Sequence, residues 1–210
     1  YHSRILDVGC GSGDFLKILQ LVGFSQLFGV DAFIPEEITG KISIQKQDFL
    51  EYSNSQNFDL LMFHSSFEHM PDSYQVLRKI NNLLSEKGHC LIRIPIKSDY
   101  IWNKYGINWF QIDAPRHFFI FTEKSFLDLA KSAGFKVENI VYESTASQFW
   151  ASEQYIKDIP LNRPNSYAIN PKASIFTTSQ IQKYEALSQK LNQEQQGDMA
   201  GFVLAKSSNL

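Results

Sequence analysis

The chain has 210 residues, of which 43% are hydrophobic, and its formal net charge is −2. This size and composition predict one domain with a sizeable core, and the near-neutral charge argues against a nucleic-acid binder. No apolar run reaches the ~18 residues of a membrane span, and no signal peptide is recognisable. Residue 1 is Tyr rather than Met, which leaves open an earlier natural start.

The two cysteines, Cys10 and Cys90, are too few for a disulfide framework. Neither belongs to a CxxC pattern, and no HxxxH spacing occurs, so the sequence predicts no metal site. Two reduced thiols are typical of a cytoplasmic protein, and that location is the expectation here.

The first part of the chain alternates apolar strands with a helix. The predicted strands cover residues 5–8, 27–30, 42–46 and 58–63. Between the first two strands, apolar side chains at helical spacing predict a helix from Asp14 to Val22, which ends at Gly23.

The second part continues the alternation. The predicted elements are a helix from Pro71 to Ser85, a strand over 89–96, a helix from Thr122 to Ala133, and strands over 136–142 and 201–205. Such alternation predicts an α/β fold with a parallel sheet covered by helices. Residues 145–196 interrupt the pattern and contain a helix with an expected capping box at Ser179 and Gln182. We expect a single domain over 1–210, with 145–196 as a lid or an oligomer contact.

Three glycines, Gly9, Gly11 and Gly13, follow the first predicted strand at every second position. Glycine lets a backbone bend sharply and approach a ligand closely. A dinucleotide fingerprint requires a further glycine where this chain has Asp14, whose carboxylate would repel a pyrophosphate. A P-loop requires a lysine that is absent from this loop. The loop therefore suits a nucleoside ligand without a phosphate chain.

The stretch "LDVGCGSG" resembles the first motif of the class I S-adenosylmethionine-dependent methyltransferases. Further segments agree in order, namely "FGVDA", "QKQDFLEY", "FDLLMFHSSFEHMPD", "LLSEKGHCLIRIP" and "LAKSAGFKVENI". The resemblance implies a Rossmann-like, doubly wound, mostly parallel sheet of seven strands with an antiparallel last strand. It also implies S-adenosylmethionine as the cofactor.

The resemblance assigns cofactor-binding roles to residues at four strand ends. Asp31 would bind the ribose, Asp48 and Phe49 would lie at the adenine, and His64, Ser65 and Ser66 would lie beside the methionine part. The implied set is Asp7, Gly9, Cys10, Gly11, Ser12, Gly13, Asp31, Ala32, Asp48, Phe49, His64 and Ser65, with Ser66 beside it. For Asp31, a turn residue without contact to ligand is the alternative interpretation.

The stretch "WFQIDAPRH" resembles a segment of a methyltransferase subgroup associated with the biosynthesis of polysaccharides and other small molecules. A hydroxyl acceptor must lose a proton, and histidine is the usual base near neutral pH. His117 is the first candidate for this catalytic base and His64 the second. Asp113 would orient His117, and Arg116 would hold an anionic group or an internal carboxylate. The same residues could instead lock the loop by hydrogen bonds.

Several aromatic and amide side chains are candidates for the acceptor pocket. Trp109 and Trp102 could stack on a sugar or pack in the core, and both interpretations stay open. Gln148, Trp150 and Tyr155 are expected to line the pocket from the 145–196 segment.

The sequence thus predicts methyl transfer from S-adenosylmethionine to a small molecule, with a hydroxyl of a saccharide or related metabolite as the expected acceptor. One alternative is a non-catalytic binding module on the same fold. The other is a nicotinamide-dependent oxidoreductase, which the glycine spacing and Asp14 disfavour. The expected partner is a small-molecule substrate without nucleic acid or membrane, and a homodimer stays open.

Overall fold

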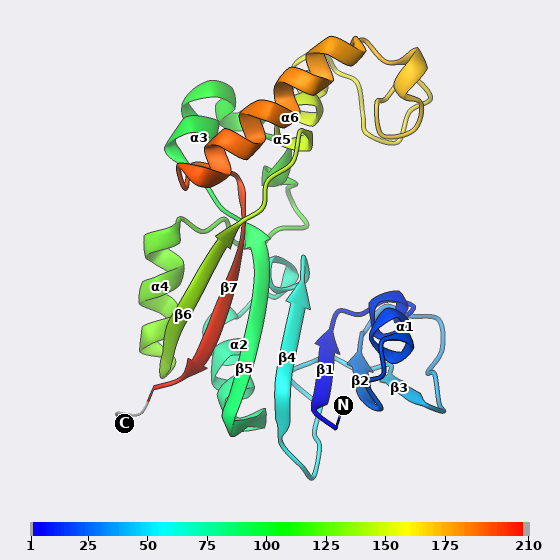
Figure 1. The fold of residues 1–210 in the computed structure, drawn as a ribbon, viewed down its shortest axis with the longest axis vertical. Helices are drawn as coiled ribbons and strands as arrows, with labels where there is room; N and C mark the ends of the chain where they lie inside the picture. Colours follow the sequence, from blue (N-terminus) through cyan, green and yellow to red (C-terminus); the bar gives the residue numbers. More distant parts are fainter. Residues whose placement is uncertain (1, 208–210) are drawn as a thin grey trace. The chain divides into compact units, whose positions relative to one another are not determined.

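The computed structural model of the chain describes residues 2–207, and within them it contains a sheet of seven strands (Figure 1). The order across the sheet is β3-β2-β1-β4-β5-β7-β6. The strands are β1 Arg4–Val8, β2 Gln26–Val30, β3 Ile42–Gln45, β4 Phe58–His64, β5 Leu84–Pro95, β6 Phe135–Tyr142 and β7 Met199–Lys206. Strands β1 to β5 pair in parallel, and β7 runs against its neighbours in Figure 1. The predicted Rossmann-like fold is confirmed.

The described helices are α1 Asp14–Leu21, α2 Ser73–Leu83, α3 Asp99–Tyr105, α4 Glu123–Ser132, α5 Ser147–Ile156 and α6 Thr178–Gln193. Four of the six described helices, α1, α2, α4 and α6, begin close to where the sequence predicts a helix, whereas α3 and α5 were not predicted. Four short 3-10 turns are η1 Phe67–His69, η2 Gly106–Asn108, η3 Phe110–Ile112 and η4 Pro171–Ala173. Within the described residues, no helix combines the length and apolar character that crossing a membrane requires.

Two helix starts differ from the sequence prediction. Helix α2 begins at Ser73 rather than Pro71, because the Asp72 carboxylate caps it by accepting from the Gln75 N–H at 2.9 Å. The capping box of α6 is formed by Thr177 and Gln180, two residues before the predicted pair. In both cases several polar residues lie near the helix start, and the backbone geometry decides which of them becomes the N-cap.

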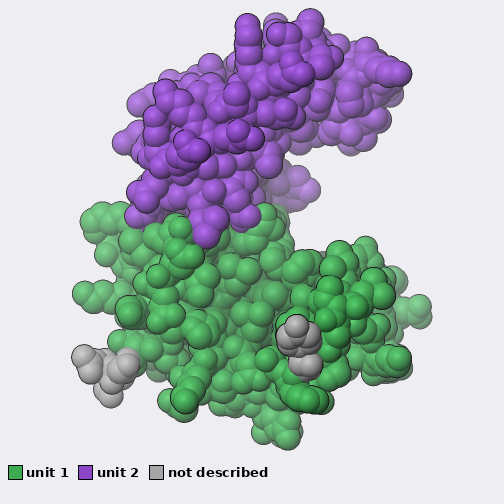
Figure 2. Space-filling view, viewed as in Figure 1, with its two compact units in different colours: residues 1–94, 124–140, 201–210 green, residues 95–123, 141–200 purple. Residues whose placement is uncertain are grey.

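The chain divides into two compact units (Figure 2). Among the described residues, unit 1 comprises 2–94, 124–140 and 201–207, and unit 2 comprises 95–123 and 141–200. Unit 2 therefore combines the 145–196 segment with the stretch after β5, where α3, η2 and η3 replace the expected loop. The single domain over 1–210 stays a prediction, and its residues 1 and 208–210 lie outside the described part.

Unit 1 has an apolar core on each side of its strands. On one side Leu16 of α1 is fully buried among strand residues, namely Ile5, Leu27, Ile42, Ile44 and Met62. The other side holds a run of edge-on or tilted aromatic contacts that joins Phe63, Phe67, Phe126 and Phe202. Strand β4 contributes to both cores because its alternate side chains point to opposite faces.

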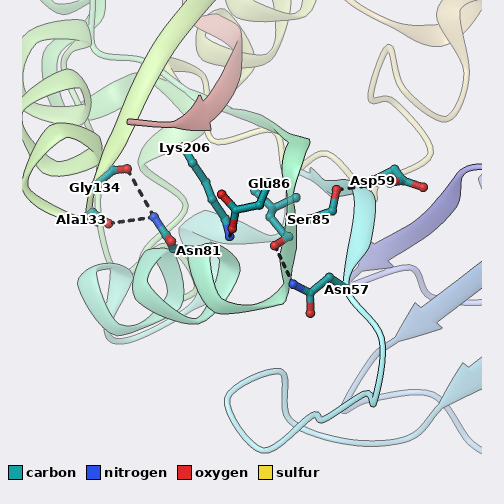
Figure 3. A network of polar contacts seen from close by, with 9 residues as sticks. Asn57, Asp59, Asn81, Ser85, Glu86, Ala133, Gly134 and Lys206 are labelled. Atoms are coloured by element: carbon teal, nitrogen blue, oxygen red, sulfur yellow. Dashed lines mark hydrogen bonds and ion pairs between the residues drawn. The ribbon is translucent and has the colours of Figure 1, made fainter. Parts of the chain in front are cut away.

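A polar network at the start of β5 and the end of β7 fastens unit 1 (Figure 3). The Asn81 side chain on α2 donates to the carbonyls of Ala133 and Gly134, at 3.5 and 3.3 Å, and so ties α2 to the turn after α4. Lys206 and Glu86 form an ion pair at 3.4 Å. Ion pairs with an exposed partner contribute only about 0–1 kcal/mol, so the buried core dominates the stability of this unit.

Unit 2 has its own core, built from α3, α5, α6 and η2. Ile101, Tyr105, Trp109, Phe149 and Leu191 pack together in it. Because Trp109 is fully buried, its indole N–H needs an acceptor, and it donates to the Asp198 carboxylate at 2.9 Å.

Candidate active site

The candidate ligand site of unit 1 lies where the strand order reverses, at the carboxyl ends of β1 and β4. The chain first builds β2 and β3 on one side of β1 and then β4 and β5 on the other. Ligands of open α/β sheets bind at such a reversal, because the loops after the two strands diverge there. The glycine loop follows β1, and residues 64–66 follow β4.

The glycines of the loop have different tasks. Gly9 has a φ of 74°, and a Cβ there would lie 2.4 Å from the Ser66 Cβ, so close packing of the two loops requires glycine. Gly11 has a φ of 52°, and no atom lies within 4 Å of where its Cβ would be. The backbone at Gly11 therefore faces open space, as a surface that a ligand approaches must.

Asp31 directly follows β2 and joins the glycine loop to the next segment. Its carboxylate accepts from the Gly11 N–H at 2.9 Å and from the Phe33 N–H at 2.8 Å, one bond on each oxygen. A carboxylate oxygen has a second lone pair, so Asp31 can hold the loop and still accept from two ribose hydroxyls. The turn role and the ligand role proposed for Asp31 are thus compatible.

Phe33 was missed by sequence reasoning. Its side chain is 95% exposed although it is large and apolar, and it stands two residues after Asp31. Ala32 beside it is exposed as well. An aromatic residue two positions after the acid at a strand end is the sequence signal that could have marked Phe33 as a candidate for stacking on a nucleoside base.

Asp7 lies near the end of β1, and its side chain is buried. Burial, and then the nearby charge of Asp31, raise the pKa of Asp7 to about 6. Burial likewise raises the pKa of the half-buried Cys10 thiol to about 12, so this thiol is no nucleophile at neutral pH. Ser12 is exposed and bonds to Asp14 next to it.

Of the two residues predicted to contact the adenine, Asp48 is accessible to a ligand and Phe49 is not. Asp48 is exposed, and its carboxylate accepts from the Leu50 N–H at 2.7 Å. Phe49, in contrast, is 5% exposed and packs edge-on against Phe63, with ring centroids 5.4 Å apart. Its ring belongs to the core, so the expected contact of this side chain with a purine is not supported.

The segment after β4 carries the residues predicted beside the methionine part. His64 lies against Phe15, with ring centroids 4.8 Å apart, and its Nδ1 is 3.4 Å from the Arg93 guanidinium. Ser65 has a positive φ of 53° and is exposed. Ser66 is buried and donates to the Val8 carbonyl at 2.6 Å, which fastens this segment to β1.

Glu68 is a further buried acid near this loop, and its sequence position favours a structural role over contact with ligand. It is 1% exposed, and burial raises its pKa to about 7. One of its oxygens, Oε2, has no hydrogen-bond partner among the described residues. A carboxylate after an apolar strand and before a helix is too common a pattern to have singled it out.

Unit 2 contains the residues predicted to bind and activate the acceptor. The His117 ring bonds through Nδ1 to the Gln111 carbonyl at 2.7 Å. A carbonyl only accepts, so Nδ1 carries the hydrogen of this bond. The Asp113 carboxylate lies 3.7 Å from Nε2 and pairs with Arg116 at 2.7 Å. Asp113 thus holds Arg116 as an internal partner, and the Gln111 carbonyl orients the histidine.

Two aromatic or amide side chains expected in the acceptor pocket lie in the core instead. Trp109 is fully buried and bonded to Asp198, so it has no ring face to offer a sugar. Gln148 is also fully buried and donates to the Ser188 hydroxyl at 2.9 Å. Trp102 is 38% exposed, with the Lys97 ammonium 5.0 Å from its ring centroid, and Tyr155 is half-buried.

The structure therefore groups the predicted site residues in two sets. Those for the cofactor belong to unit 1, and the candidates His117, Asp113 and Arg116 belong to unit 2, with His64 as the one catalytic candidate in unit 1. A glycine loop at a strand-order reversal, followed by an acid at the end of the neighbouring strand, defines a nucleoside-binding α/β protein.

A sequence profile of the family described as "Methyltransferase domain" matches residues 1–140. The chain therefore belongs to this family, within the class I S-adenosylmethionine-dependent methyltransferases, and S-adenosylmethionine is the cofactor of the class. The residues present fit that cofactor, because Gly11 leaves open space and Asp31 keeps acceptor capacity. The predicted class and cofactor are confirmed, and the nicotinamide alternative is removed. The polysaccharide subgroup stays a prediction.

Known proteins resemble the chain at modest identity. The malonyl-[acyl-carrier protein] O-methyltransferase of Calditerrivibrio nitroreducens is 27% identical over 86 residues, which are 40% of this chain and 35% of that protein. The chain thus matches little more than a third of the length of this curated relative.

Two solved structures resemble the fold over almost the whole chain. A chain in the complex between the Haloferax volcanii Trm112 methyltransferase activator and the putative methyltransferase has a TM-score of 0.64 at 15% identity, covering 98% of this chain and 83% of that one. An S-adenosylmethionine-dependent methyltransferase of Archaeoglobus fulgidus has a TM-score of 0.57 at 20% identity, covering 97% and 86%. At these identities the likeness establishes the fold.

Proposed function

We propose that the protein transfers a methyl group from S-adenosylmethionine to a small-molecule acceptor, at a hydroxyl of a saccharide or related metabolite. The observation that carries the proposal is Asp31, whose two oxygens hold the Gly11 and Phe33 amides and keep acceptor capacity for a ribose. The acceptor class rests on the resemblance of the segment around His117.

When bound, the cofactor supplies an electrophilic methyl group on a cationic sulfur. The chain supplies a site of matching charge, since Asp7 and Asp31 lie at the ends of neighbouring strands without a basic residue in the loop between 9 and 13. Positioning the two reactants against each other lowers the activation barrier of such a reaction by up to about 7–11 kcal/mol. The glycine loop and Asp31 provide the positioning on the cofactor side.

His117 is the proposed base for the hydroxyl proton. With its Nδ1 hydrogen donated to Gln111, Nε2 accepts the proton, and the Asp113 carboxylate at 3.7 Å stabilises the imidazolium that results. The His117 side chain is 5% exposed, and its hydrogen bond to the Gln111 carbonyl holds the ring in one orientation.

The test is a methyl-transfer assay with S-adenosylmethionine and a panel of sugars, quinones and fatty acids. We expect turnover with a hydroxylated acceptor, and we expect His117→Gln to lower kcat by about 10²-fold or more because proton transfer is lost. His89→Gln is the matched control, since His89 is exposed and only pairs with Glu138 at 3.2 Å.

Unchanged turnover in His117→Gln would show that His117 is not the base, and it would not affect the assignment of the cofactor site. Tight binding of S-adenosylhomocysteine without turnover on any acceptor would instead favour the non-catalytic module. The cytoplasmic location and a homodimer stay predictions, and sedimentation analysis tests the latter.

A further inference from the structure

Unit 2 contains a cavity of about 420 Å³ between the start of α5, the loop after it and the middle of α6. We propose that this cavity binds a neutral oligosaccharide. Its size is that of a small-molecule site. None of its lining residues belongs to the cofactor site of unit 1. The side chains used below are Thr145, Ser147, Trp150, Tyr167, Glu185 and Gln189. The inference goes beyond the proposed methyl transfer and does not depend on it.

Two aromatic rings form a corner of the cavity. Trp150 and Tyr167 are both half-buried, and their ring centroids lie 5.3 Å apart with the planes inclined by 45°. Aromatic faces bury the apolar C–H surface of a flat ligand at little entropic cost, because the rings have few rotatable bonds. A pyranose ring has such a surface on each face.

The polar groups of the cavity match hydroxyl groups rather than ions. Glu185 and Gln189 lie one turn apart on α6 and are both exposed, so a carboxylate and an amide point from the same stretch of helix. A carboxylate accepts from two hydroxyls, and an amide both donates and accepts. The hydroxyls of Thr145 and Ser147, 2.8 Å apart, add a third polar position.

The same lining disfavours charged ligands. Among the described residues that line this cavity, Glu185 is the one charged side chain, and it would repel a phosphate or a carboxylate. A quaternary ammonium ion would be attracted by Glu185 and the rings, but it cannot hydrogen-bond to Thr145, Ser147 or Gln189. A polyhydroxylated neutral ligand uses all of these groups.

Buried hydrogen bonds hold the walls in place. Gln154 of α5 is fully buried, and it donates to the Ser166 hydroxyl at 3.0 Å and accepts from the Tyr167 N–H at 2.8 Å. It therefore fixes the loop that carries Tyr167 to the helix that carries Trp150. Gln148 ties α5 to α6 through Ser188, which also lines the cavity. A site built in advance binds more tightly because less ordering is needed on binding.

A second cavity, of about 650 Å³, continues the first along α6. The two share Tyr167, Ile181 and Glu185 in their linings. The second adds Phe176 and one further charged side chain, Lys172, so its described lining has one ammonium and one carboxylate group and no net charge. Figure 1 shows the segment between α5 and α6 as a loop that returns to the start of α6, where this second cavity lies. Because the second cavity adjoins the first through three shared lining residues, the site extends beyond a single cavity, which favours an oligosaccharide over a monosaccharide.

The test is calorimetric titration of the whole chain, without S-adenosylmethionine, using maltotriose, xylotriose, chitotriose and galactotriose, with choline and inorganic phosphate as charged probes. We expect saturable binding of at least one trisaccharide below about 10 mM. Glu185→Gln is expected to weaken it about tenfold, as for a hydrogen bond to a charged group. Trp150→Leu is expected to weaken it at least as much.

Glu194→Gln is the matched control, because this exposed residue is at the end of α6 and only pairs with Lys190 at 3.7 Å. It is expected to leave the dissociation constant within about twofold. The proposal is overturned if no trisaccharide binds at that concentration, if choline or phosphate binds in preference, or if Glu185→Gln and Glu194→Gln behave alike. Binding of S-adenosylhomocysteine, measured separately, reports on the proposed function alone.

Discussion

Asp31 has two tasks at once, since it holds the glycine loop and is proposed to bind the ribose. We expect Asp31→Asn to lower the affinity for S-adenosylhomocysteine at least about tenfold, because hydrogen bonds to a charged group are lost. Calorimetric titration measures the dissociation constant of S-adenosylhomocysteine for both proteins. Asp14→Asn serves as the control, because Asp14 is exposed and pairs only with Lys17 and Ser12 nearby. An affinity of Asp31→Asn within about twofold of the wild type would show that Asp31 is no ribose ligand.

Titration of the single residue Glu68 is expected to make the free energy of unfolding depend on pH. Its pKa is raised from 4.5 to about 7 in the folded state, since burial disfavours the charged form. Its stabilising contribution is therefore complete below pH 4.5 and is lost as the pH rises through 7. We expect the free energy of unfolding, relative to Glu68→Gln, to fall by up to about 3 kcal/mol between pH 4 and 8.

Chemical denaturation of the wild type and of Glu68→Gln across this pH range measures the difference. Because every other titrating group is common to both proteins, subtraction isolates Glu68. Parallel curves would mean that the carboxyl is solvated or paired in solution, which contradicts the buried position in the structure.

At the scale of elements, the sequence near the start of α6 offers two possible capping boxes, and the structure forms only one of them. Thr177 accepts from the Gln180 N–H at 3.2 Å, and the Gln180 side chain accepts from the Thr177 N–H at 2.9 Å. Ser179 and Gln182 have the same spacing, but Ser179 lies inside the helix. Thr177 itself has extended backbone angles, φ −83° and ψ 156°, and only the residue at the transition into the helix can cap it.

We expect Thr177→Ala to lower the free energy of unfolding by about 1 kcal/mol, since a cap bond is lost. Ser179→Ala is expected to be neutral or slightly stabilising, because alanine has the higher helix propensity. Thermal unfolding followed by circular dichroism compares them. Equal effects of the two substitutions would contradict the observed capping box.

At the scale of the whole molecule, a ligand that binds only the folded state raises the unfolding temperature. S-adenosylhomocysteine at about 100 times its dissociation constant is expected to add about 2.7 kcal/mol, or about 5–10 °C for a chain of this length. NADH at the same concentration is expected to leave the temperature unchanged. Differential scanning calorimetry distinguishes the two, and stabilisation by NADH alone would contradict the assignment of the cofactor.

Much of this molecule follows from local pattern. The alternation of apolar strands and helices, and the three glycines after the first strand, predict the sheet, the strand-order reversal and the class of ligand. These features are local, because a positive φ at Gly9 or an acid at the end of β2 depends on a few adjacent residues. The sequence therefore determined the fold class and the class of cofactor, whereas the individual cofactor-binding residues stay predictions.

Burial and partners were decided only by the tertiary structure. The sequence predicts Gln148 and Phe49 as ligand contacts and leaves Trp109 open between ligand stacking and core packing, and the structure buries all three side chains. Trp109 is held by Asp198, 89 residues further along the chain, and no local pattern reports such a contact. The cavity proposed to bind an oligosaccharide has the same origin, since Trp150, Tyr167 and Glu185 line it together only after α5 and α6 pack against each other. Side chains far apart in sequence acquire a common surface through packing, which is a property of the folded chain.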